Sequence, residues 1–93
     1  MVQSTLPDQT TIRQAGERIK DRVVRTPVWQ SLDLDQAAGR SLLLKCENLQ
    51  RTGSFKVRGA LNWIRTATGE ELADGLVTVS AGNHAIALAW GPR

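Results

Sequence analysis

The chain has 93 residues, 41% of them hydrophobic and 23% charged, and its 12 basic and 9 acidic side chains give a formal net charge of +3. A chain of this length forms at most one small domain and buries only about 60 to 65% of the surface that its unfolded form exposes, so we expect a marginal core. One cysteine and one histidine exclude a disulfide framework and a Cys/His zinc cluster, and no metal site is predicted.

The distribution of charge and the composition of the N-terminus indicate whether the protein binds nucleic acid or membrane and where in the cell it is expected. The sequence pI of 9.8 is typical of nucleic-acid binding, but the basic residues between Arg13 and Arg25 are interleaved with Glu17 and Asp21, and no aromatic side chains alternate with them. Residues 1–10 lack the apolar core of a signal peptide, and no apolar run approaches the roughly 18 residues that span a bilayer. We therefore expect a cytoplasmic protein that binds neither nucleic acid nor membrane.

Apolar periodicity predicts the elements of the first half of the chain. Apolar residues at spacings of three and four predict a helix over 11–24, with Thr11 and Gln14 as a capping box and a Thr-Pro pair after its end. Residues 28–39 are expected to be a connection with a single helical turn. A short apolar run at 42–44 predicts a strand that is buried on both faces.

Turn formers and apolar spacing divide the second half in the same way. Residues 48–54 predict a loop, and a helix follows over 55–66. A polar connection then leads to a second β-branched strand at 76–79, and a last helix begins near Asn83. The order helix, strand, helix, strand, helix predicts an α/β fold with a parallel two-stranded βαβ unit of right-handed crossover.

Two predicted strand-to-helix loops, Thr52–Lys56 and Ser80–His84, have small residues where a helix begins. In a parallel sheet both loops leave the carboxyl ends of strands, which is the edge where α/β folds bind ligands. The free N–H groups at each helix start favour an anion. The glycine spacing matches neither a P-loop nor Gly-x-Gly-x-x-Gly, so the pattern predicts phosphate or carboxylate recognition without identifying the ligand.

Lys56 is expected in the first turn of the second helix, beside Phe55. The helix dipole and partial burial both disfavour an ammonium there, so we expect a lowered pKa for Lys56, as amine chemistry on a carbonyl requires. The alternative is a solvated lysine that points away from the sheet. The residues alone leave both interpretations open.

The segment Lys45–Ala60, which reads KCENLQRTGSFKVRGA, closely resembles the cofactor-attachment segment of threonine dehydratases and serine racemases. These are fold-type II (tryptophan-synthase β-like) pyridoxal-phosphate enzymes. Ser80–Ala85, SAGNHA, resembles the second loop of that family, and the region of Thr26 and Pro27 resembles its N-terminal segment. The resemblance spans nearly the whole chain. It implies a partial three-layer αβα fold with short parallel strands and flanking helices, pyridoxal phosphate as the cofactor, and threonine or serine as the substrate.

The resemblance also implies a role for individual residues. Lys56 is expected to bind pyridoxal phosphate covalently, to yield it to the substrate amine, and then to remove the α-proton as a free amine. Phe55 is expected to pack against the cofactor ring, and Asn83 to hydrogen-bond the cofactor's 3-oxygen. Loss of the substrate's β-hydroxyl would then give a 2-oxo acid and ammonia. The loop that takes the substrate carboxylate is expected to consist of Ser80, Gly82, Asn83 and His84.

Plainer roles for three of these residues stay open, because Ser80 and Asn83 equally fit helix caps, and His84 equally fits a hydrogen-bonded helix residue. The family's racemases have a serine base at the position of Ala81, which favours dehydration over racemisation. Family members also continue for hundreds of residues, and they supply downstream a glycine-rich phosphate loop and a Ser or Cys at the pyridine nitrogen. This chain ends before either of these, and Pro92 interrupts a helix that the family continues.

Two hypotheses therefore stand. In the first, residues 1–93 are one incomplete domain, the N-terminal part of a threonine or serine dehydratase that is active within a longer, homo-oligomeric parent, with serine racemase as the alternative activity. In the second, the chain is a catalytically silent fragment without stable cofactor binding. We expect weak or no stable cofactor attachment and no turnover from the chain alone, because contacts to the phosphate supply much of the hold on the cofactor.

Overall fold

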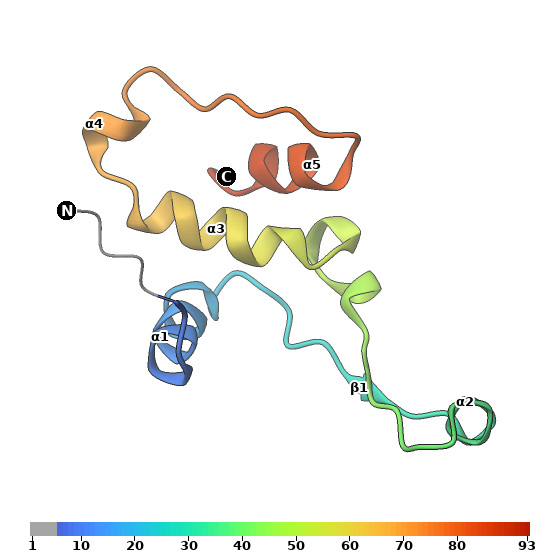
Figure 1. The fold of residues 1–93 in the computed structure, drawn as a ribbon. Helices are drawn as coiled ribbons and strands as arrows, with labels where there is room; N and C mark the ends of the chain where they lie inside the picture. The colour runs from blue at the N-terminus through green and yellow to red at the C-terminus, as the bar shows by residue number, and fades with distance from the viewer. Residues whose placement is uncertain (1–5) are drawn as a thin grey trace.

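The computed structural model describes residues 6–93. The prediction that the N-terminus has no signal peptide falls in part on residues 1–5, which lie outside the described residues. Three helices form the main body, and α3 packs against α5 on one side and against α1 on the other (Figure 1). The helices are α1 (Gln9–Ile19), α2 (Leu32–Ala38), α3 (Lys56–Thr66), α4 (Gly69–Leu72) and α5 (Asn83–Trp90), with 3-10 turns η1 (Glu47–Leu49) and η2 (Arg51–Gly53) before α3.

Helix α1 begins and ends earlier than its apolar spacing predicts. Its N-cap is Asp8, whose carboxylate accepts a hydrogen bond from the Thr11 N–H at 2.8 Å, and the Thr11 hydroxyl accepts one from the Asp8 N–H. The predicted capping box of Thr11 with Gln14 is therefore wrong by one turn. After the helix ends at Ile19, the N–H groups of Arg22 and Val23 still donate to the Ile19 carbonyl in a turn, and the Val24 N–H donates to the Gln50 side chain at 2.8 Å.

The core is small and lies between α3 and the helices beside it. Val57, Ala60 and Leu61 of α3 are buried, together with Ala87 of α5 and Ile19 of α1. Three of these five positions lie in the first half of α3, so this part of the helix is the best anchored. The predicted helices over 55–66 and from Asn83 are confirmed.

The predicted parallel strand pairing is wrong. The strands that pair within residues 6–93 are β1 (Val28–Trp29) and β2 (Leu44–Lys45), and they pair antiparallel, with Val28 opposite Lys45. The segment 76–80 is extended but unpaired among the described residues, and it runs along α5 on the side away from α1 (Figure 1). A period-2 apolar pattern predicts an extended conformation, but the choice of partner depends on tertiary placement.

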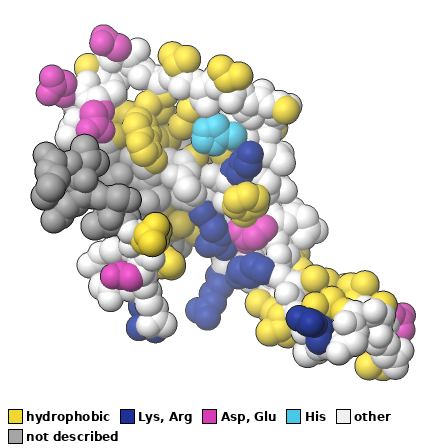
Figure 2. Space-filling model, viewed as in Figure 1, with side chains coloured by type: hydrophobic (Ala, Val, Ile, Leu, Met, Phe, Trp, Pro, Cys, Tyr) yellow, Lys and Arg dark blue, Asp and Glu magenta, His cyan; other side chains and the backbone are white. Residues whose placement is uncertain are grey.

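A small lobe of β1, α2 and β2 stands apart from the helical body, which gives the molecule a longest dimension of 52 Å (Figure 1). Hydrophobic side chains gather on the surface of this lobe (Figure 2). The most exposed of them are Val28, Trp29, Leu32 and Leu43. No helix among the described residues has the length and apolar character to cross a membrane.

Candidate active site

Lys56 is the first residue of α3, where the loop from β2 enters the helix. Phe55 is the N-cap and offers no side-chain acceptor, while the Ser54 hydroxyl accepts a weak hydrogen bond from the Lys56 N–H at 3.4 Å. The next residue, Val57, is completely buried and fixes the start of the helix in the core. The backbone of Lys56 is therefore held firmly, and its long side chain is left free.

The side chain of Lys56 shares one hollow with the second predicted loop. This hollow has a volume of about 330 Å³, and it is lined by Phe55, Lys56, Arg58, Gly59, Ala60 and His84. Lys56 and Phe55 come from the start of α3, whereas His84 comes from the start of α5. Figure 2 shows the histidine at the surface beside a Lys or Arg side chain. The structure thus brings the two predicted loops together on one face.

The predicted partial burial of Lys56 is wrong for this structure. Lys56 is exposed, and the ring of Phe55 beside it is 62% exposed. The physical reason is that no segment among residues 6–93 lies over this face of α3. The lysine nevertheless lies on the same side as the Ser80–His84 loop, since it shares its hollow with His84.

The start of α5 offers backbone donors to an anion. Its N-cap is Gly82, and no described side chain caps the helix. The Ser80 hydroxyl instead accepts a hydrogen bond from the Gly82 N–H at 3.0 Å, so the interpretation of Ser80 and Asn83 as helix caps is wrong here. The N–H groups of the first turn, which begins at Asn83, are left for another acceptor. Ser80, Gly82 and Asn83 lie next to the hollow in the chain but do not line it.

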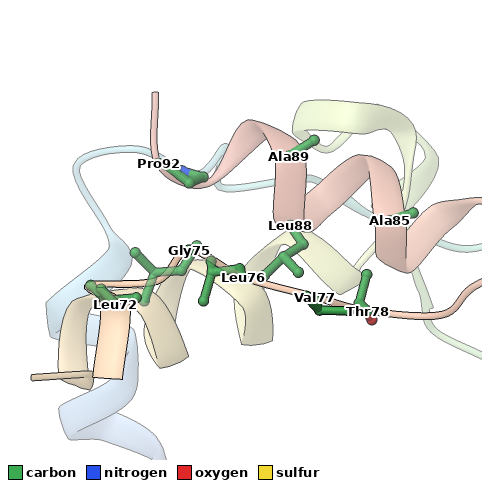
Figure 3. Close-up of a pocket in the computed structure, with 10 residues that line it drawn as sticks. Leu72, Gly75, Leu76, Val77, Thr78, Ala85, Leu88, Ala89 and Pro92 are labelled. Atoms are coloured by element: carbon green, nitrogen blue, oxygen red, sulfur yellow. The ribbon is translucent and has the colours of Figure 1, made fainter. Parts of the chain in front are cut away.

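A larger cavity of about 650 Å³ lies elsewhere, between the segment 72–78 and the face of α5 (Figure 3). Leu72, Leu76 and Leu88 are among the residues that line it, and the lining is mostly apolar. None of the predicted site residues lines it. The predicted site residues Phe55, Lys56 and His84 line the smaller hollow instead. Residues 6–93 contain no cluster of three or more His, Cys, Asp or Glu side chains that could hold a metal ion.

A polar cluster below the Lys56 loop was missed by the sequence analysis. The Glu47 carboxylate forms an ion pair with Arg58, through Nε to Oε1 and through Nη2 to Oε2 at 3.0 Å. Its Oε2 also accepts hydrogen bonds from the Thr26 hydroxyl at 2.6 Å and from Gln50 Nε2 at 3.3 Å. Thr26 and Gln50 are only 3% and 5% exposed. Chiefly because Arg58 donates to it, the pKa of Glu47 is lowered from 4.5 to about 2.

Gln50 connects this cluster to the segment before β1. Its side chain accepts from the Val24 N–H and donates to the Val24 carbonyl, both at 2.8 Å. The signal for the cluster in the sequence was two polar residues, Glu47 and Gln50, that follow a strand at a spacing of three. Gln50 was placed in the predicted loop over residues 48–54, and Glu47 was assigned no role.

Thr52, within the same loop, has a backbone conformation that β-branched residues rarely adopt, with φ of +67°. Its hydroxyl is buried and has no hydrogen-bond partner among the described residues. Such a conformation costs on the order of 1 to 3 kcal/mol and persists where surrounding contacts impose it. The Gln50 contacts and the buried Val57 on either side of Thr52 are the contacts that do so.

Comparisons with known proteins show the family and the fold to which this chain is similar. Residues 19–92 match the family described as pyridoxal-phosphate dependent enzyme. The chain is 45% identical to serine racemase of Dictyostelium discoideum over 93 residues, which cover 100% of this chain and 28% of that protein. It is 47% identical to L-threonine ammonia-lyase of Geobacter sulfurreducens over 81 residues, or 87% and 20% of the two chains. The structure of maize serine racemase aligns with a TM-score of 0.80 at 45% identity, over 90% of this chain and 26% of that one.

The chain belongs to the pyridoxal-phosphate dependent enzyme family, and its α/β fold is part of the fold-type II architecture. It spans between a fifth and about three tenths of the length of the relatives above. The cofactor of this family is pyridoxal phosphate. The residues present fit that cofactor, since the hollow combines a primary amine, an aromatic ring and a nearby helix start with uncapped N–H groups.

Proposed function

We propose that this chain supplies the lysine and the substrate-carboxylate loop of an enzyme that acts on threonine or serine and removes the β-hydroxyl to give a 2-oxo acid and ammonia. The observation that carries the proposal is that Phe55, Lys56 and His84 line one hollow, although they come from two loops far apart in the sequence. The ammonia-lyase of Geobacter sulfurreducens among the relatives supports this activity.

Each predicted site residue has a task in this proposal. Lys56 would hold the cofactor through its amine, and its Nζ would take the α-proton of the substrate. Phe55 would orient the cofactor ring, and Asn83 would hold its 3-oxygen. The first-turn N–H groups of α5, with Ser80, Gly82 and His84 around them, hold the substrate carboxylate. Pyridoxal phosphate, when bound, stabilises the negative charge that forms on the substrate Cα.

Serine racemase is the second candidate, because it is the activity of the similar proteins from Dictyostelium discoideum and maize. Racemisation needs a group that returns a proton from the face opposite Lys56. The family's racemases place a serine at the position of Ala81, and the alanine methyl group has no proton to give. This substitution is the reason to prefer elimination.

The test begins with covalent trapping. The chain is incubated with pyridoxal phosphate, reduced with borohydride, and digested for mass spectrometry of each lysine. We expect modification of Lys56 in preference to Lys20 and Lys45, loss of the signal in Lys56→Ala, and no loss in the matched control Lys20→Ala. Equal modification of all three lysines would show that Lys56 has no special site.

The reaction itself is then assayed in any longer open reading frame that contains the chain. Production of 2-oxobutanoate from L-threonine, or of pyruvate from L-serine, supports elimination. Formation of D-serine without keto acid would support the racemase instead. Robust turnover by the 93-residue chain alone would contradict the expectation that the missing phosphate contacts are needed.

A further inference from the structure

The ion pair between Glu47 and Arg58 joins two residues that lie on either side of Lys56 in the sequence. Residues 47–58 therefore form a closed ring that contains Lys56. Glu47 lies two residues after the end of β2, and Arg58 lies two residues after Lys56 in the first turn of α3. Gln50, three residues after Glu47, is fastened to Val24 by two hydrogen bonds of 2.8 Å. The backbone that carries Lys56 is therefore held at both ends of the ring and once between them.

The chemistry of this cluster requires a carboxylate at position 47. All the groups that reach the two oxygens are donors: the two guanidinium nitrogens of Arg58, the Thr26 hydroxyl and the Gln50 amide nitrogen. A glutamine here has one oxygen and one NH₂ group, so one donor of the cluster would face another donor. Because Thr26 and Gln50 are buried, water does not readily replace the lost partner.

We propose that Glu47 is a positioning residue for Lys56, whose carboxylate fixes the entry of the β2–α3 loop into α3 and so sets the direction in which the lysine amine leaves the helix. The inference rests on the proposed role of Lys56. The side chain of Lys56 is exposed, so what the described residues fix is its backbone and the direction of its Cα–Cβ bond. Small displacements of a reacting group are costly, since about 1 Å can reduce a rate about 100-fold.

The chain offers a matched control at the other end of the same helix. Asp21 forms a two-pronged ion pair with Arg65 near the C-terminus of α3, at 2.5 and 3.0 Å. E47Q and D21N therefore each remove one negative charge and one arginine pair from α3. Only E47Q touches the ring that contains Lys56. A general loss of helix stability would affect both variants, whereas a loss of positioning would affect E47Q alone.

The test measures two quantities in the 93-residue chain at about pH 7. The first is the ratio of borohydride-trapped pyridoxal phosphate on Lys56 to that on Lys20, and the second is the amide hydrogen exchange of residues 50–58. We expect E47Q to lower the ratio about tenfold and to raise the exchange about tenfold, and D21N to change each by less than about twofold. Circular dichroism verifies that each variant is folded.

The proposal is overturned if folded E47Q keeps the wild-type ratio, or if D21N lowers it as much as E47Q does. If E47Q does not fold, R58K decides the question, because lysine keeps the charge but cannot donate two parallel hydrogen bonds. An R58K ratio about threefold lower supports the proposal, and an unchanged ratio overturns it. If the wild-type chain traps no cofactor, hydrogen exchange still decides whether Glu47 fixes the segment, and the proposed function is decided separately by trapping and turnover in the longer open reading frame.

Discussion

Replacing Glu47 by glutamine should make the free energy of unfolding depend less strongly on pH between 4.5 and about 2. The pKa of Glu47 is lowered from 4.5 to about 2 in the folded chain, mainly by the hydrogen bonds from Arg58. A carboxylate whose folded pKa is below its unfolded pKa stabilises the fold fully above pH 4.5, and this contribution is lost as the pH falls through 4.5 towards 2. The wild-type chain should therefore lose stability over this interval for a reason that E47Q does not share.

The size of the effect follows from the shift and from the exposure of the pair. A shift from 4.5 to about 2 corresponds to about 3 kcal/mol at most. The side chain of Arg58 is 34% exposed, so solvent screens the pair, and we expect about 1 to 2 kcal/mol. At neutral pH, E47Q should lower the free energy of unfolding by a similar amount.

Urea denaturation followed by circular dichroism gives the free energy of unfolding at about pH 7 and about pH 3. The control is E17Q, which removes a carboxylate from the exposed Glu17–Lys20 pair and should keep the wild-type dependence on pH. If the free energy of unfolding falls equally between the two pH values in wild type and in E47Q, the reasoning is refuted. It is also refuted if E17Q loses as little as E47Q does, since the effect would then come from overall charge.

Two further changes test the packing of the helices. Leu61→Ala empties a fully buried position in α3 and should lower the free energy of unfolding by about 2 to 4 kcal/mol, seen as a lower urea midpoint, whereas Leu6→Ala at an exposed site should leave the midpoint unchanged. Arg22→Ala removes a guanidinium that lies 4.4 Å from the ring centroid of Trp90 and donates to the Gly91 carbonyl at 3.0 Å, and should cost about 1 kcal/mol. Faster hydrogen exchange at the C-terminal end of α5 would locate that loss, and unchanged exchange there would contradict it.

Helices with a regular apolar stripe could be predicted well from the sequence. The spacing of Phe55, Ala60, Leu61 and Ile64 predicted α3 to within one residue, because local backbone hydrogen bonds and one buried face decide such a helix. The path of the chain after α1 could not be predicted, since the Val24 N–H donates to the Gln50 side chain, which is 26 residues away in the sequence. The pairing of β2 with β1 also depends on distant residues, and no periodicity in the sequence contains that information.

The sequence could predict which residues line the hollow, but not the burial of Lys56 or the Glu47 cluster that holds its loop. The motif around Lys56 and the loop before α5 identified the residues that meet at the hollow. The burial of Lys56 was predicted from local rules alone, and burial depends on what lies over a residue in space. The Glu47 cluster was missed because its four members come from three separate segments. Their individual residue types are common in turns, and only their convergence gives them a role.

The extended segment between α4 and α5 has a consequence for handling the protein. Val77 and Val79 are 95% and 97% exposed, and the backbone beside them is unpaired among the described residues. A bare β-branched strand edge is a template on which another extended chain can hydrogen-bond. Purified at high concentration, this chain should form intermolecular β-structure and precipitate, and a lysine at position 77 or 79 should keep it in solution.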